Sequence, residues 1–241
     1  MNIRKSFFTL VLATVGLGGL PSAAGAFTLS HIQSDAQFES LLPDAAFVAQ
    51  GRIGDLDSPA TYELDLHEDD PGMPSSIAQF NWQQNVPQSF LLSYDQVSNL
   101  VTYTVGSETM TYNANDTFTD VVIRTRAAVA GSSITVGNLM LDGQSLMDSS
   151  QADGSSANTL DYLRIGDLSS NSFTLMGDIS MNWVGDARNL TDMTAPHQSQ
   201  LSFQIKAVNI AASVPEPASM SLMSVGVGVL AMYSRRRKHT V

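Results

Sequence analysis

Short alternating segments separated by turn residues constrain the fold of this chain more than any other feature. In Ala60–Leu66, the apolar residues Tyr62, Leu64 and Leu66 alternate with polar ones, and Leu201–Val208 repeats the pattern. β-branched and aromatic residues, which favour strands, are also frequent in segments 89–94, 100–105, 121–126 and 172–176. About ten such segments predict an all-β chain that folds as an antiparallel, jelly-roll-like β-sandwich.

Local turn signals refine this prediction. Gly106-Ser107 and Gly137-Asn138 each place a glycine first between two strand-like segments, which favours a two-residue hairpin loop of type II′. The first loop would join 100–105 to 108–112, and the second 133–136 to 139–141. Residues 149–158 are rich in Ser, Asp and Gly and predict a long surface loop.

One short helix is predicted near the start of the body. Ser34 and Gln37 have the spacing of a capping box, and Pro43 ends the run. Phe38, Leu41 and Leu42 would lie along one side of this helix, so we expect that side to pack on the sandwich.

The absence of cysteine excludes several classes of protein for this chain. With no Cys in 241 residues, the chain has no disulfide scaffold, no cysteine nucleophile and no thiolate metal site. A hydrophobic content of 43% beside 15% charged residues is too apolar for a disordered polymer. We therefore expect one globular domain, residues 27–213, between two processing segments.

Residues 1–26 have the organisation of a secretory signal peptide. Arg4 and Lys5 precede the 14-residue apolar run Phe7–Leu20, and Ala24 and Ala26 form a small-x-small cleavage site for signal peptidase. An uncleaved N-terminal anchor is the alternative, but a spanning helix needs about 20 residues.

The C-terminal segment, residues 214–241, has three parts in a fixed order. Pro215-Glu216-Pro217 cannot continue a helix or a central strand, so we expect this tripeptide to be extended and accessible. The uncharged run Ala218–Tyr233 follows, and as a helix it would be about 24 Å long and enter the membrane. Four basic residues end the segment and would stay in the cytoplasm: Arg235, Arg236, Arg237 and Lys238.

This order resembles the PEP-CTERM sorting signal of Gram-negative bacteria. The resemblance implies that an exosortase in the membrane recognises Pro215, Glu216 and Pro217 and removes the helix and the basic tail. The body would be membrane-anchored before this step and released or re-anchored at the cell surface after it. A single-pass anchor that is never cut is the alternative.

Removing both segments makes the body more acidic than the whole chain. The body has six basic and 22 acidic side chains, a net charge of −16, against −11 for the full sequence. This charge keeps an exported protein soluble and excludes a general nucleic-acid binder, which needs a basic face for phosphates.

A second resemblance concerns the body itself. Phe47–Asp55, Ala60–Leu66, Ala78–Trp82 and Phe90–Asp95 are similar to segments of the choice-of-anchor W domain, over about residues 27–210. The resemblance implies that the protein is exported and sorted to the cell surface. It implies no biochemical activity, because none is assigned to that family.

Three sets of residues could carry chemistry. Glu63 and Asp65 are the best-framed carboxylate pair for a secreted hydrolase, but their alternation with Tyr62, Leu64 and Leu66 predicts that both point into water. Glu68, Asp69 and Asp70, with Asp55 and Asp57 upstream, are weak calcium candidates, because a solvated charge run is the more common reason for such a cluster.

Trp82 and Trp183 could stack on sugar rings if they line an open groove, although packing in the core explains them more simply. The sequence therefore favours an exported, non-enzymatic protein of the cell surface or extracellular matrix, with exopolysaccharide as a candidate partner. A glycan-binding module and an uncharacterised secreted hydrolase are the alternatives.

Overall fold

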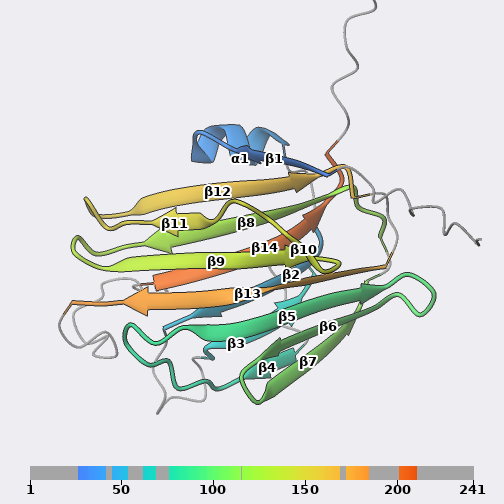
Figure 1. Cartoon of the computed structure of the whole chain (residues 1–241), viewed down its shortest axis with the longest axis horizontal. Helices are drawn as coiled ribbons and strands as arrows, with labels where there is room; N and C mark the ends of the chain where they lie inside the picture. The colour runs from blue at the N-terminus through green and yellow to red at the C-terminus, as the bar shows by residue number, and fades with distance from the viewer. Residues whose placement is uncertain are drawn as a thin grey trace, which may run out of the picture.

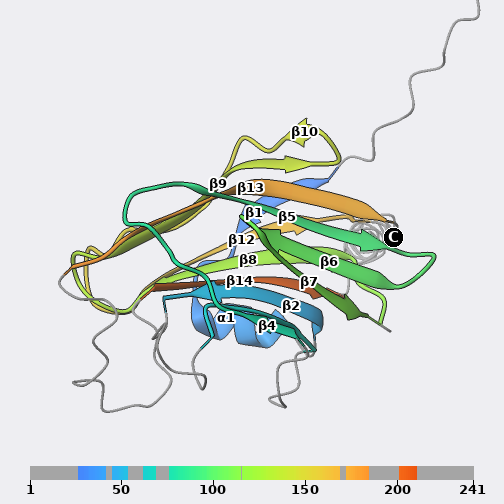
Figure 2. The same ribbon diagram turned by 90° about the horizontal axis from the view of Figure 1, so that it is seen from below.

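The computed structural model describes residues 27–41, 45–53, 62–68, 76–114, 116–168, 172–184 and 201–210. Within these ranges the chain forms two antiparallel sheets of seven strands each and one helix (Figures 1 and 2). The prediction of an all-β sandwich is confirmed at this level. The expected signal helix and C-terminal helix, in residues 1–26 and 214–241, lie outside the described residues.

Each sheet mixes strands from distant parts of the chain. Sheet A has the order β1 (Thr28–His31), β12 (Thr159–Gly166), β8 (Asp120–Ala127), β14 (Leu201–Val208), β2 (Ala45–Arg52), β3 (Leu64–His67), β4 (Ser76–Ala78). Sheet B has the order β10 (Gln144–Ser145), β9 (Ser133–Leu141), β13 (Phe173–Asn182), β5 (Gln88–Asp95), β6 (Leu100–Val105), β7 (Glu108–Asn113), and β11 (Ser150–Ala152) pairs with β9.

The main core lies between the two sheets. Along β14 the alternate residues Leu201, Phe203 and Ile205 are buried and face sheet B, as their period of two predicts. Sheet B contributes Leu92 and Tyr103 to the same cluster. This shared apolar layer orients the outer face of sheet A away from sheet B.

A second, smaller core lies on that outer face, under helix α1 (Asp35–Leu41). Figure 2 shows α1 on the side of sheet A that faces away from sheet B. The amide of Gln37 donates to Ser34 Oγ at 3.1 Å, and Phe38 is buried against Tyr162 with ring centroids 4.4 Å apart. The predicted cap is confirmed, whereas the side chains of Leu41, Leu42 and Pro43 lie outside the described residues.

The two predicted hairpins have different outcomes. Gly106-Ser107 joins β6 to β7, and Gly106 has a φ of +56°, as the first position of a type II′ loop requires. The prediction of a hairpin at Gly137-Asn138 is wrong, because β9 continues through these residues as one strand. The pairing of β9 with β13 shifts register at this point, and Asn138 has a φ of +51°. These residues therefore form a β-bulge.

Two further predictions need correction. Residues 149–158 are not a surface loop throughout, because β11 pairs with β9 and buries Ser150 and Ala152. The sequence also predicts that Phe80 and Trp82 share one face of a strand, but β4 ends at Ala78 and irregular backbone follows. Both errors concern residues whose structure depends on contacts with distant strands.

Both ends of the described body leave sheet A at the same end. Thr28, at the start of β1, pairs with Gly166 in β12, and Val208, at the end of β14, pairs with Asp120 in β8. Because β12 and β8 are neighbours, these residues form one row across four strands, and Thr28 and Val208 are roughly 15 Å apart. Figure 1 shows the blue start of β1 and the orange tip of β14 on the same side of the molecule. We call this the terminal end of the sandwich.

The packing of the Phe203 and Trp82 side chains against Gly51 predicts the cost of a substitution at this glycine. A Cβ at Gly51 would lie 2.4 Å from the Phe203 ring and 3.1 Å from Trp82, so Gly51→Ala should lower the free energy of unfolding by roughly 1–3 kcal/mol. Gly137→Ala is the matched control, because its Cβ would have no neighbour closer than 3.5 Å and should cost less than about 0.5 kcal/mol. Urea denaturation measures both, and equal losses would contradict the packing described.

Candidate functional site

The sequence-predicted hydrolase pair is buried rather than solvated. Glu63 and Asp65 do point away from Leu64 and Leu66, as predicted, but they are only 1% and 0% exposed. Glu63 Oε2 accepts a hydrogen bond from the amide of Phe80 at 3.2 Å, and Asp65 Oδ2 accepts one from Gln50 Nε2 at 2.5 Å. The prediction that both side chains point into water is wrong, because both are buried and accept hydrogen bonds from neighbouring segments of the chain.

Burial raises the pKa of Asp65, although the hydrogen bond from Gln50 and the charge of His67 oppose this effect. His67 Nε2 lies 3.7 Å from Asp65 Oδ1, beyond hydrogen-bonding distance. A buried carboxylate with a raised pKa is a common feature of catalytic acids. Here, however, the carboxylate accepts a hydrogen bond from the amide of Gln50, and it is not among the residues that line the cavity described next.

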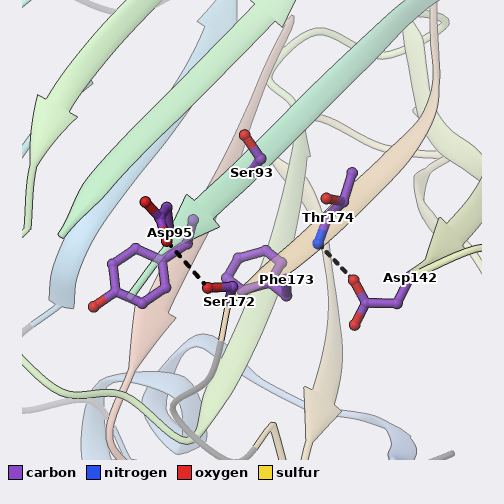
Figure 3. Close-up of a pocket in the computed structure, with 7 residues that line it drawn as sticks. Ser93, Asp95, Asp142, Ser172, Phe173 and Thr174 are labelled. Carbon is purple, nitrogen blue, oxygen red and sulfur yellow. Dashed lines mark hydrogen bonds between the residues drawn. The ribbon is translucent and has the colours of Figure 1, made fainter. Parts of the chain in front are cut away.

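A cavity of about 360 Å³ lies elsewhere, at one end of β5 and β13 (Figure 3). Its walls are Ser93, Tyr94, Asp95, Asp142, Ser172, Phe173 and Thr174. Asp95 and Asp142 lie on either side of Phe173 and accept hydrogen bonds from Ser172 Oγ at 3.4 Å and from the Thr174 amide at 2.8 Å.

These two carboxylates stabilise turns. Asp95 also accepts hydrogen bonds from the Ser98 hydroxyl and the Val97 amide, which lower its pKa. A glycoside hydrolase that uses a pair of carboxylates needs one carboxyl group that stays protonated near neutral pH. Asp95 has the opposite tendency, so the arrangement favours structure over acid–base chemistry.

His31 in β1 contacts one carboxylate in the neighbouring strand β12 and one in the segment between β10 and β11. Its Nδ1 lies 2.9 Å from Asp161 Oδ1 and its Nε2 lies 3.2 Å from Asp148 Oδ1. Partial burial alone would lower the pKa of His31, but the hydrogen bonds to both carboxylates raise it above its usual value. Both ring nitrogens are therefore occupied by carboxylates, which leaves no nitrogen to activate a serine.

The two tryptophans pack in or against the core. Trp82 is 3% exposed, its Nε1 donates to the Arg52 carbonyl at 2.9 Å, and its ring packs edge-on against Phe80 and Phe203. Trp183 is half-buried against the main core. Trp82 is thus excluded as an open platform for sugar rings.

Of the calcium candidates, only Glu68 belongs to the described residues, where it is exposed and its carbonyl accepts a hydrogen bond from His67. Asp55, Asp57, Asp69 and Asp70 lie outside them. Within the described ranges, no group of three or more His, Asp or Glu side chains is arranged to hold a metal ion.

The residues predicted for sorting also fall outside the described ranges. They are Ala24 and Ala26, the tripeptide Pro215, Glu216 and Pro217, and the basic residues Arg235, Arg236, Arg237 and Lys238. The structure does fix the point where the chain leaves the sandwich toward the tripeptide. Thr119 Oγ1 donates to the Ile210 carbonyl at 3.4 Å, and the Thr119 amide donates to the Val208 carbonyl at 2.9 Å. No helix in the described residues is long and apolar enough to span a membrane.

Comparison with known proteins identifies the C-terminal segment. Residues 213–238 match the PEP-CTERM protein-sorting motif. This motif marks the chain as an exosortase-sorted protein that carries a membrane-anchoring sorting signal and is processed by an exosortase. No curated protein matches the chain, and the resemblance of the body to the choice-of-anchor W domain finds no support in these comparisons.

The raised pKa of Asp65 predicts a pH-dependent gain in stability from Asp65→Asn. The charged carboxylate is unfavourable when buried, so the stability of the wild type falls as the pH rises through the pKa of Asp65. Asn should raise the free energy of unfolding by on the order of 1 kcal/mol at about pH 8 and change it little at about pH 4.

Asp95→Asn is the control, because the lowered pKa of Asp95 predicts a loss at neutral pH instead. Urea titrations at the two pH values measure both variants. A destabilised Asp65→Asn protein at about pH 8 would contradict this account.

The environment of His31 predicts that His31→Gln affects stability mainly at low pH, whereas Asp65→Asn affects it mainly at high pH. Because folding raises the pKa of His31, the charged imidazole stabilises the fold fully below about pH 6.5, and this stabilisation is lost as the pH rises through the raised pKa. The variant should therefore lose more thermal stability at about pH 5.5 than at about pH 8.5. Asp148→Asn should reduce this pH dependence, and equal losses at both pH values would contradict the charged contact.

Proposed function

We propose that this chain is an exported, non-enzymatic protein of the cell surface or extracellular matrix, whose C-terminal signal is removed by an exosortase. One observation carries the proposal, the PEP-CTERM motif at residues 213–238. In this account the sandwich is the delivered part, and signal peptidase removes residues 1–26 first.

The geometry of the terminal end supports this order of events. Pro215 lies five positions after Ile210, a distance of at most roughly 18 Å when the chain is fully extended. Thr28, two residues after the proposed signal cleavage at Ala26, lies in the same row as Val208. A body held at either terminus therefore presents the same end to the membrane, and it can complete both sheets before the second cut.

The side-chain environments support a non-enzymatic role. Asp65 and Glu63 accept structural hydrogen bonds, both ring nitrogens of His31 contact carboxylates, and the cavity carboxylate Asp95 has a lowered pKa. Hydrolysis by carboxylates requires two acids with pKa values pushed apart across an open cleft. The described residues offer stabilising contacts in place of that arrangement.

Replacing the tripeptide tests the proposal directly. Pro215→Ala, Glu216→Gln and Pro217→Ala together should abolish C-terminal processing and keep the protein in the membrane fraction, because the exosortase loses its recognition residues. Ser219→Ala, two residues beyond the tripeptide, is the matched control and should leave processing unchanged. Fractionation and immunoblotting of the producing cells measure the result. Normal release of the triple variant would contradict the proposal.

The short connection to Ile210 makes a second prediction. Deleting Ala211, Ala212 and Ser213 moves Pro215 to within two residues of Ile210, at most roughly 7 Å of chain, so the folded body should block access and reduce processing several-fold. Replacing the same three residues with Gly-Ser-Gly keeps the length and should preserve processing. Pulse-chase labelling compares the rates, and equal rates for the deletion and the replacement would contradict the steric argument.

A further inference from the structure

The outer face of sheet B is rich in hydroxyl groups. Its strands contain no lysine, arginine or histidine. The residues that alternate with the buried core positions, and so project outward, include Ser89, Ser93, Thr102, Thr104, Thr109, Thr111, Thr135, Thr174 and Ser180. Figure 2 shows that α1, the one helix of the described residues, lies on the opposite side of the molecule.

Strand register places four of these hydroxyl groups in one line. Thr111 in β7 pairs with Thr102 in β6, Thr102 pairs with Ser93 in β5, and Ser93 pairs with Thr174 in β13. Three strand spacings make this line roughly 14 Å long. We call these four residues the hydroxyl row.

The hydroxyl row ends in the cavity of about 360 Å³. Ser93 and Thr174 belong to its walls, and Figure 3 shows them on adjacent strands between Asp95 and Asp142. The other walls include the rings of Tyr94 and Phe173, which pack edge-on against Phe118 in the core. Packing therefore holds the cavity in one shape, which lowers the entropic cost of binding a ligand there.

The polar groups along this path have unused hydrogen-bonding capacity. Within the described residues, none of the four hydroxyl groups of the row makes a hydrogen bond, whereas Thr104 and Thr109 on the same face bond to each other at 3.0 Å. Asp142 Oδ1 accepts a hydrogen bond from the Thr174 amide, but its Oδ2 has no partner in the described part of the chain. Hydroxyl groups can both donate and accept, and a carboxylate oxygen accepts only. The path thus suits a ligand that presents many hydroxyl groups.

The charges on this face narrow the class of ligand further. Because sheet B has no basic side chain in its strands, it offers no cationic partner to phosphate or carboxylate groups. Asp178, farther along the same face, already accepts hydrogen bonds from Ser89 Oγ at 2.8 Å and Asn138 Nδ2 at 2.9 Å. The carboxylates of Asp95 and Asp142 lie only at the cavity, so an extended polycation would find no acidic partner along the row.

An apolar row runs beside the hydroxyl row. Leu91 pairs with Met176, and Met176 pairs with Met140, which is 37% exposed. These residues lie two positions along the strands from Ser93 and Thr174, roughly 7 Å away. Sugar rings have apolar C–H faces and polar edges, so neighbouring apolar and hydroxyl rows match both parts of such a ring.

We propose that the cavity and the hydroxyl row bind an uncharged polysaccharide, with the Asp142 carboxylate accepting hydrogen bonds from sugar hydroxyl groups. Hydrogen bonds to an ionised carboxylate are roughly twice as strong as those between neutral groups. The lowered pKa of Asp95 keeps the neighbouring carboxyl group ionised, so this site holds the sugar without an acid to cleave it. This ligand goes beyond the proposed function, which requires none.

Calorimetric titration of the full-length chain with barley β-glucan, galactomannan and dextran tests the proposal. The protein is kept in CHAPS micelles, because this detergent has no sugar head group that could occupy the site. At least one of the three polymers should bind with a dissociation constant below about 1 mM. Polygalacturonate should bind at least about 10-fold more weakly, because its carboxylates are repelled by those of the cavity.

Substitutions in the cavity and the row should weaken binding without changing the fold. Asp142→Asn should weaken it about 10-fold, since Asn tolerates the φ of +49° at this position but removes the charge. Ser93→Ala and Thr102→Val should each weaken it about 3-fold, because each removes one hydroxyl group. Melting temperatures confirm that each variant is folded, and one that does not fold is replaced by Ser93→Phe, which fills the cavity and should abolish binding.

Two substitutions on the same face are matched controls. Thr135→Val removes a hydroxyl group from β9, where Thr135 pairs with Ser180, six positions or roughly 20 Å along β13 from Thr174. Asp178→Asn removes a carboxylate that already has two partners in the chain. Each should change the dissociation constant less than about 2-fold.

Several outcomes would overturn the proposal. They are absence of binding to all three polymers, equal effects of Thr102→Val and Thr135→Val, and binding of polylysine at least as tight as that of the best neutral polymer. Loss of binding in EDTA would also overturn it, because a bound cation would then replace the direct contact with Asp142. None of these results bears on C-terminal processing, so failure here is distinct from failure of the proposed function.

Discussion

Apolar contact between the two sheets is the interaction on which the rest of this structure depends. The Phe118 ring lies within this contact, close to the terminal end. Its centroid is 5.7 Å from that of Phe47 in sheet A. In sheet B, it is 4.9 Å from the ring centroid of Tyr94 and 5.7 Å from that of Phe173. In a chain without cysteine, no disulfide holds the sheets together. Burial of such side chains supplies the stability that a small exported domain otherwise takes from covalent links.

The same contact positions the chain for processing. Phe118 directly precedes Thr119, whose amide and hydroxyl bond to the carbonyls of Val208 and Ile210. The core thereby fixes the end of the last strand next to the start of the first, and only a short segment separates it from the sorting motif. The packing of Phe118 therefore fixes the point at which the chain leaves the sandwich toward the sorting motif.

The sequence predicts which residues alternate along a strand, but it does not predict which distant segments pack against each face. Period-two alternation correctly separates Leu64 and Leu66 from Glu63 and Asp65, but it cannot say that the second face is covered, because the covering residues are distant in sequence. Gly137-Asn138 was ambiguous for a related reason, since hairpin loops and bulges both use residues with positive φ. The contacts of His31 with Asp148 and Asp161 likewise depend on pairings between distant strands, which no local pattern encodes.

The central claim is that the sorting segment is removed from a delivered β-sandwich. Intact-mass spectrometry of the protein recovered from the cell exterior tests this claim most directly. The account predicts a mass that begins at Phe27 and lacks Ala218–Val241 on every molecule, with any added anchor measured as a defined increment. Recovery of the exterior protein with the complete C-terminal tail would contradict it.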